Sequence, residues 1–233
     1  MTVPNLQEAT MPRSRIALAC LLALSTAPVL AQGGPDIDKV NGSITAEAGQ
    51  AYGDLETVNG SIRIETGASF EDAETVNGSI KADDRIQADS LATVNGSIRV
   101  GADARIAGDV ETVNGSVFID RGGRLHAVST VNGAIGLVDS DLSGGIETVH
   151  GDITVGAGSH VRGGIQVEKP TGNNWFSVGK RKPPRIIVGP EARVDGPLVF
   201  EHEVKLYVHR TATVGDIRGA TAVRYDGDRA PAD

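Results

Sequence analysis

The fold is decided by the stretch Glu56-Thr57-Val58-Asn59-Gly60-Ser61-Ile62, because close copies of it recur along the 233-residue chain. The Val-Asn-Gly triplet starts at Val40, Val58, Val76, Val94, Val113 and Val131, and a seventh copy at Val149 reads Val-His-Gly. The steps between these valines are 18, 18, 18, 19, 18 and 18 residues. A fixed period of this size is typical of repeat proteins, in which each repeat packs on its neighbours.

Apolar residues recur at fixed places in the repeat. If the valine of Val-Asn-Gly is position one, position five is Ile44, Ile62, Ile80, Ile98, Val117, Ile135 and Ile153. Position thirteen is mostly apolar, at Tyr52, Phe70, Ala88, Ile106, Leu125 and Val161, with Ser143 as the exception. Positions one, three, five and seven alternate with exposed positions as in a β-strand, and no segment shows the period of a helix.

This pattern predicts an all-β fold, because one repeat cannot bury its apolar side chains alone but a stack of repeats can. We expect a single-stranded parallel β-helix, or β-solenoid, of about nine rungs with about 18 residues in each. A rung is one complete turn of the solenoid. Neighbouring rungs should lie about 4.8 Å apart, which is the spacing of hydrogen-bonded strands.

The Asn-Gly pair tolerates the backbone angles of a tight corner. If the rungs stack in register, the asparagine amides can also hydrogen-bond to one another along the solenoid. The alternative is that they only form turns. The predicted ladder consists of Asn41, Asn59, Asn77, Asn95, Asn114 and Asn132.

Position six carries the cations Arg63, Lys81 and Arg99 in consecutive rungs, and position eight carries Glu65 and Asp83. Residues two apart on a strand share a face, so the pattern favours a charge-balanced, solvated surface. The alternative is a basic stripe that binds an anionic polysaccharide.

The first 31 residues resemble a secretory signal peptide, with a basic region, an apolar region over residues 16–30 and small residues ending at Ala31. Translation starting at Met11 would fit this pattern better. Cys20, the only cysteine, would be removed with the signal, and its use as a lipoprotein anchor is the alternative. We therefore expect an exported protein, periplasmic or at the cell surface, without a transmembrane segment after signal removal.

The repeat pattern also divides the rest of the chain. We expect a lead-in over 32–38, regular repeats over 39–167, an inserted loop between rungs over 168–185, terminal rungs over 186–219 and a polar tail over 220–233. Residues 199–208 alternate as one strand. Trp175 and Phe176, in the loop, either pack against the solenoid or offer a contact surface to a protein or a sugar.

The composition limits the function. With 22 basic and 30 acidic residues the net charge is -8, so the chain should have no general affinity for nucleic acid. The five histidines show no metal-ligand spacing. We predict no cofactor, no metal site and no catalytic residue.

The reiterated Val-Asn-Gly-Ser-Ile motif resembles an adhesin-like family of secreted bacterial β-solenoid proteins. The segments at Val100 and Val188, related to Val-Gly-x-x-Ala-x-Val-x-Gly-x-Leu, resemble bactofilins, which are polymer-forming proteins of the bacterial cytoskeleton. The two resemblances cover about residues 39–219 and imply a right-handed helix and end-to-end polymerisation. The signal peptide and the Trp-containing loop depart from cytosolic bactofilins.

Repeated surfaces without a unique cluster of reactive side chains favour a non-enzymatic structural or adhesive solenoid of the bacterial cell envelope. Its terminal rungs would associate with other copies, and its partners would be envelope polysaccharides or proteins. The alternative is a β-helix that binds or processes polysaccharide, with Asp139, Asp141, His160 and Arg162 as candidate residues.

A hexapeptide-repeat acyltransferase is a third possibility, suggested by valines six residues apart at Val149, Val155, Val161 and Val167. It is disfavoured because Ile153 and Ile165 stand where that fold needs small residues.

Overall fold

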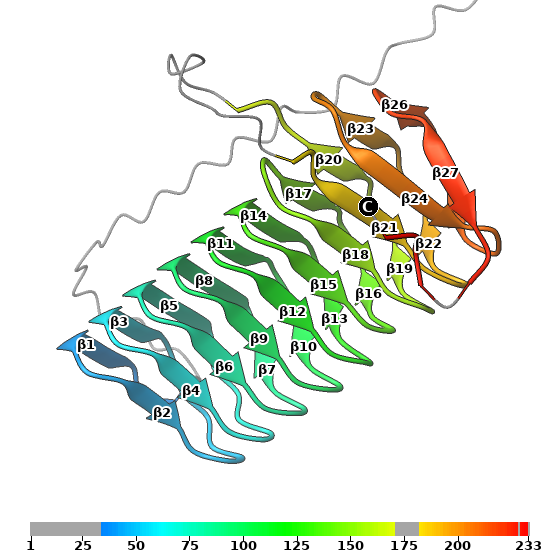
Figure 1. Ribbon diagram of the computed structural model, residues 1–233. Coiled ribbons are helices and arrows are strands. Elements are labelled where there is room, and N and C mark those ends of the chain that lie inside the picture. The colour runs from blue at the N-terminus through cyan, green and yellow to red at the C-terminus, as the bar shows by residue number, and fades with distance from the viewer. Residues whose placement is uncertain (1–33, 171–181, 228, 233) are drawn as a thin grey trace, which may run out of the picture. The chain divides into compact units, whose positions relative to one another are not determined.

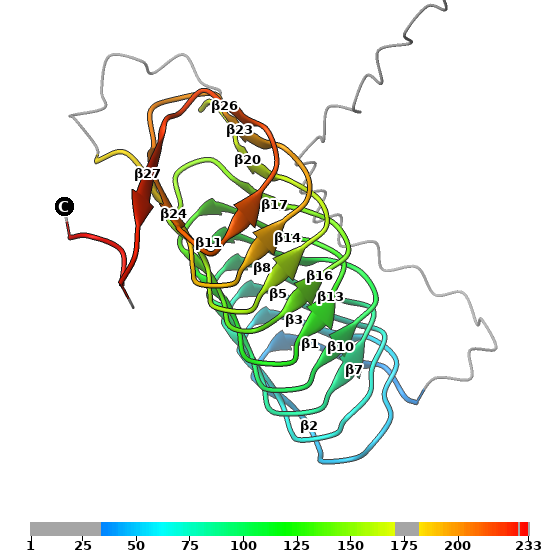
Figure 2. The same cartoon turned by 90° about the vertical axis from the view of Figure 1, so that its right-hand side faces the viewer.

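The computed structural model describes residues 34–170, 182–227 and 229–232, and it shows a parallel β-solenoid (Figure 1). The described residues contain strands and turns but no helix. Three parallel sheets run along the solenoid, and equivalent strands of successive rungs pair side by side. Figure 2 shows the rungs lying one behind another.

Sheet A carries the strand before the corner that contains Asn-Gly in the first six rungs. Its ten strands are β1 (Ile37–Asn41), β3 (Leu55–Asn59), β5 (Asp72–Asn77), β8 (Ser90–Asn95), β11 (Val110–Asn114), β14 (Val128–Asn132), β17 (Ile146–Thr148), β20 (Ile165–Val167), β23 (Leu198–Phe200) and β26 (Ile217–Arg218).

Sheet B carries the strand after each corner. Its ten strands are β2 (Ile44–Ala46), β4 (Ile62–Ile64), β6 (Ile80–Ala82), β9 (Ile98–Val100), β12 (Val117–Ile119), β15 (Ile135–Leu137), β18 (Ile153–Val155), β21 (Arg185–Val188), β24 (Lys205–His209) and β27 (Ala222–Tyr225).

Sheet C closes each rung with very short strands. They are β7 (Gln87–Ala88), β10 (Arg105–Ile106), β13 (Arg124–Leu125), β16 (Asp141–Leu142), β19 (His160–Val161), β22 (Arg193–Val194) and β25 (Thr213–Val214). Isolated bridges at Ala51, Ser69 and Gln87 continue the same pairing toward the N-terminus.

The core is one column of apolar side chains inside the three sheets. Leu55 of sheet A and Ile62 and Ile64 of sheet B are fully buried, and Phe70 is 5% exposed. Burying each such side chain contributes about 1.5–3 kcal/mol relative to exposure. The predicted β-solenoid with a period of about 18 residues is therefore confirmed, with ten rungs rather than nine.

The side chain that points into the core just before the corner is not the one predicted. Thr57 is buried, whereas the valine at position one lies partly outside and reaches 68% exposure at Val40. Positions one to seven are not one strand, because the chain turns at Asn-Gly and starts the alternation again at Ile62. The inward side chain before the corner is therefore the threonine.

The apparent exception at Ser143 is a one-residue shift. Leu142 pairs with Leu125 and Val161 in sheet C and is fully buried, so the inward position is apolar in this rung too. Ser143 itself is exposed.

Two expected features near the C-terminus also differ. Residues 199–208 are not one strand, because β23 ends at Phe200 and β24 starts at Lys205, with a corner between them. The segment expected as a polar tail contains β27, which pairs with β24. Its Tyr225 is buried against His209, with the ring centroids 5.0 Å apart.

The insertion lies within a rung and replaces one corner. It leaves the stack after β20 and returns at β21, so Arg185 belongs to a strand rather than to the loop. His202, from the corner of the next rung, lies 2.9 Å from the carbonyl oxygen of Val149, a residue of the preceding corner. The corners on either side of the insertion thus contact each other directly. Trp175 and Phe176 lie outside the described residues.

Candidate functional site: the groove and polar network of sheet C

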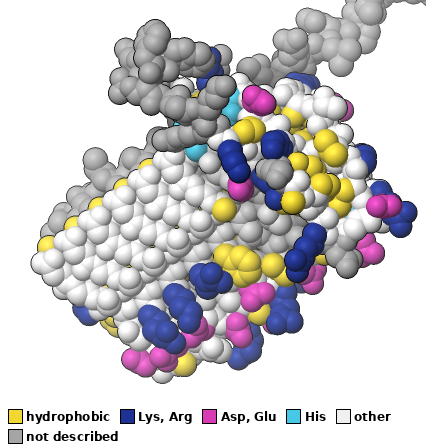
Figure 3. Space-filling model, in the orientation of Figure 1, with side chains coloured by type: hydrophobic (Ala, Val, Ile, Leu, Met, Phe, Trp, Pro, Cys, Tyr) yellow, Lys and Arg dark blue, Asp and Glu magenta, His cyan; other side chains and the backbone are white. Residues whose placement is uncertain are grey.

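The six predicted asparagines form a continuous ladder along the corner between sheets A and B. The side-chain amide of Asn59 donates to Asn41 over 3.1 Å, and the same bond joins each later pair up to Asn132 at 3.0–3.1 Å. Since each amide serves its neighbour, the ladder explains the repeated asparagine structurally. Figure 3 shows a broad surface along these rungs that consists of backbone and of side chains that are neither charged nor hydrophobic.

The buried threonines link successive corners by hydrogen bonds on the inner side of the solenoid. The hydroxyl of Thr93 donates to the carbonyl of Gly78 in the preceding rung over 2.9 Å, and Thr75 does the same to Gly60 over 2.8 Å. Glycine is required there, because a Cβ on Gly96 would lie 1.8 Å from the Gly78 oxygen.

The predicted cations Arg63, Lys81 and Arg99 stack in register on sheet B. Arg63 and Lys81 share Asp83, at 3.4 and 3.5 Å, so Arg63 pairs with the next rung. Arg99 lies 5.0 Å from the centre of the Phe118 ring. All three cations thus have an interaction within the protein.

Sheet C carries a groove of about 560 Å³ that runs across several rungs. Its floor is apolar and consists of the slightly exposed side chains Phe70, Ala88, Ile106 and Leu125. Its cationic members are Arg105, Arg124 and Arg162, and its acidic members are Asp89 and Asp141. The groove combines an apolar base with charged walls.

Arg105 and Arg124 are the distinctive pair in this groove. They are register partners on the neighbouring strands β10 and β13, and both are exposed. Neither forms an ion pair with a carboxylate of the described residues. Two stacked like charges repel each other, so an anion bound between them would be stabilised.

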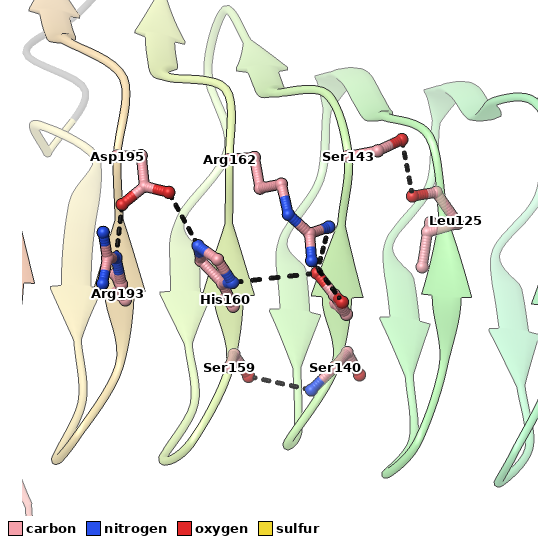
Figure 4. A network of polar contacts seen from close by, with 9 residues as sticks. Leu125, Ser140, Ser143, Ser159, His160, Arg162, Arg193 and Asp195 are labelled. Carbon is pink, nitrogen blue, oxygen red and sulfur yellow. Dashed lines mark hydrogen bonds and ion pairs between the residues drawn. The ribbon is translucent and has the colours of Figure 1, made fainter.

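A network of charged groups adjoins the groove (Figure 4). Arg162 donates two hydrogen bonds to Asp141, at 2.7 and 2.9 Å. His160 lies 2.8 Å from an Asp195 oxygen and 4.0 Å from Asp141. Arg193 pairs with the other Asp195 oxygen. The structure thus brings together three of the four candidates for polysaccharide processing, while Asp139 lies in the preceding corner with a φ of 42°.

The electrostatics of this network do not favour acid catalysis. Hydrogen bonds from Arg193 and then His160 lower the pKa of Asp195, so this carboxyl is a poor proton donor. Asp141 is held by a bidentate guanidinium. The network fits a structural role or recognition of charge better than proton transfer.

Sheet A presents a different column, of carboxyl groups. Burial raises the pKa of Glu56, Glu74 and Glu111, and nearby acidic residues raise it further. Glu56 and Glu74 are register partners on β3 and β5. These glutamates therefore destabilise the folded protein when they are ionised.

Arg105 and Arg124 were not among the residues expected to matter. The repeat nevertheless predicts that both side chains point outward, because each arginine directly precedes an inward residue at position thirteen. Arg193 and His160 are register partners on β22 and β19. The repeat period could not predict this pair, because the insertion lies between them in the sequence.

No match to this chain was found among protein-family models, curated proteins or solved structures. Within the described part of the chain, no group of three or more His, Cys, Asp or Glu side chains could hold a metal ion. The same residues include no helix with the length and apolar character needed to cross a membrane.

Proposed function

We propose that this chain is a non-enzymatic structural or adhesive β-solenoid of the bacterial cell envelope that assembles end to end. In this proposal the chain is exported to the periplasm or the cell surface, where its repeated faces contact envelope polysaccharides or proteins. The observation that carries the proposal is the incomplete burial of the two terminal rungs.

Inward apolar residues at both ends are only partly buried. Ile37 in the first rung and Ile217 in the last are partly exposed, whereas their register partners Leu55 and Leu198 are fully buried. Val214 and Ala222 follow the same pattern at the C-terminal end. A further rung stacked on either end would bury these side chains and continue the strand pairing.

The terminal rungs carry opposite charge. Residues 34–54 hold four acidic residues and one lysine, a net charge of -3. Residues 210–225 hold three arginines and one aspartate, a net charge of +2. This complementarity favours head-to-tail stacking over pairing of identical ends.

Head-to-tail contact uses two different surfaces of the same molecule, so each addition leaves a free end. Such an interface produces filaments rather than closed dimers. The paired carboxylates of the sheet C network support a non-enzymatic role, because a polysaccharide-cleaving site needs an available proton donor.

Light scattering and negative-stain microscopy of the purified chain, across a series of protein and salt concentrations, test the proposal. We expect filaments one solenoid wide that grow with protein concentration. The double variant Arg218→Glu/Arg224→Glu should weaken assembly by reversing the charge of the C-terminal rung.

The control is Lys81→Glu/Arg99→Glu, which makes the same change in net charge in the third and fourth rungs and should still assemble. A monodisperse rod about 48 Å long, from ten rungs at about 4.8 Å each, would contradict end-to-end assembly. Equal loss of assembly in both variants would contradict the assignment of the interface.

A further inference from the structure

The groove on sheet C has the chemistry of a ligand site rather than of a solvated face. We propose that it binds a linear polysaccharide that carries carboxylate groups, with Arg105 and Arg124 as the anion-binding residues. This inference adds a ligand to the adhesive role proposed above but does not depend on end-to-end assembly.

The first argument is the local charge. The chain as a whole is acidic, with a net charge of -8, so it should repel acidic polymers unless a local site attracts them. On sheet B, Asp83 pairs with Arg63 and Lys81, and Arg99 lies against Phe118. In the groove itself, Arg162 pairs with Asp141. Arg105 and Arg124 have no such partner among the described residues.

The second argument is the kind of anion. Arg162 already holds the Asp141 carboxylate through two parallel hydrogen bonds, at 2.7 and 2.9 Å, within the same groove. A guanidinium forms this fork with carboxylate in a specific geometry. Arg124 lies on β13, two rungs before Arg162, and a carboxylate of the ligand at Arg124 would form the same kind of contact there.

The third argument is the shape of the groove. Its floor, from Phe70 to Leu125, crosses three rung spacings, or about 14 Å. An apolar floor of this length suits the flat faces of successive sugar rings, while Gln87 and Ser143 on the walls can hydrogen-bond to hydroxyl groups. A small inorganic anion would use neither the floor nor its length.

The test is isothermal titration calorimetry of the full chain with polygalacturonate at low salt. Neutral pullulan and dextran sulfate are titrated in parallel. We expect binding of polygalacturonate, weaker binding of dextran sulfate and none of pullulan. Arg105→Gln/Arg124→Gln should weaken polygalacturonate binding by about tenfold or more, because two charge-assisted contacts are lost.

The matched control is Arg63→Gln/Lys81→Gln, which removes the same charge from sheet B and should bind like the unmodified protein. Both variants change exposed side chains, and circular dichroism checks that both are folded. Equal weakening by the two variants would show general charge attraction and overturn the site. Failure of polygalacturonate to bind, or tighter binding of dextran sulfate, would overturn the ligand class. Light scattering on the same samples reports assembly separately, so the two proposals can fail independently.

Discussion

The threonine before each Val-Asn-Gly is polar yet lies inside the solenoid. Its position is possible because the hydroxyl donates to the glycine carbonyl of the preceding rung, as Thr93 does to Gly78 over 2.9 Å. Buried polar groups are tolerated only when they are paired in this way. The hydroxyl therefore ties one corner to the next.

Thr93→Val tests the energy of this bond. The substitution keeps the shape of the side chain but leaves the Gly78 carbonyl without its hydroxyl donor. We expect a loss of about 1–2 kcal/mol in the free energy of unfolding, measured by urea denaturation. Thr45→Val is the matched control, because Thr45 is exposed on sheet B and the same change should have little effect. Equal losses would show that the hydrogen bond is not the cause.

Gly96→Ala tests the close approach of successive corners. A Cβ at this position would lie 1.8 Å from the backbone oxygen of Gly78, so the corners must move apart. We expect destabilisation of about 3 kcal/mol, which thermal unfolding would detect. Gly136→Ala should be much milder, because its Cβ would meet only the side chain of Phe118, at 3.3 Å. A small effect of Gly96→Ala would mean that the corner is not tightly packed.

At the scale of one element, sheet A carries a row of glutamates whose carboxyl groups share the same direction of pKa shift. Glu56, Glu74 and Glu111 all have pKa values raised by burial and by acidic neighbours. A raised pKa means that the folded state binds the proton more tightly than the unfolded state does. The resulting destabilisation is complete above the folded pKa and is relieved as the pH falls through it.

We therefore predict that the unfolding temperature rises as the pH is lowered from about 7 to about 5. Glu74→Gln/Glu111→Gln should raise the stability at neutral pH, by at most about 1 kcal/mol because both side chains are partly solvated, and should reduce the dependence on pH. The lowered pKa of Asp195 acts in the opposite direction, but only at more acidic pH.

Glu47→Gln is the control, since Glu47 is exposed and lies outside the sheet A column. If stability instead falls steadily from neutral pH downward in the unmodified protein, the glutamate column does not set its response to acid.

At the scale of the whole molecule, each rung contacts chiefly the rungs on either side. Equivalent strands pair from β1 to β26 and from β2 to β27 without exchange of order. In such an array the stability is approximately a sum over rungs and their interfaces. The number of rungs is therefore adjustable, whereas their register is not.

Deletion of residues 59–76 removes one 18-residue repeat and joins Val58 to Asn77. We expect a folded solenoid with one rung fewer, a β-type circular dichroism spectrum and a slightly lower unfolding temperature. Deletion of residues 59–67 removes half a repeat and should prevent folding, because the inward positions no longer stack. Folding of both variants alike would contradict the registered array.

The sequence by itself determined the sheet-forming repeat, its period and the asparagine ladder. These features are local and periodic, so a residue such as Asn59 meets its own equivalent, Asn77, wherever identical rungs stack. The same reasoning placed Ile62 and Ile64 in the core.

Only the tertiary structure decided where the period is irregular. It placed Leu142 rather than Ser143 inside, divided residues 199–208 at a corner, and set Asp195 beside His160 across the insertion. The physical reason is that equivalent strands of successive rungs pair in register, so a change in corner length is absorbed between strands. Leu142 follows its partner Leu125 by 17 residues, yet Ile146 follows Val128 by the usual 18. Such a local shift depends on contacts between rungs and cannot be read from the period alone. The groove of Arg105 and Arg124 is likewise a property of stacked rungs, since no single repeat contains it.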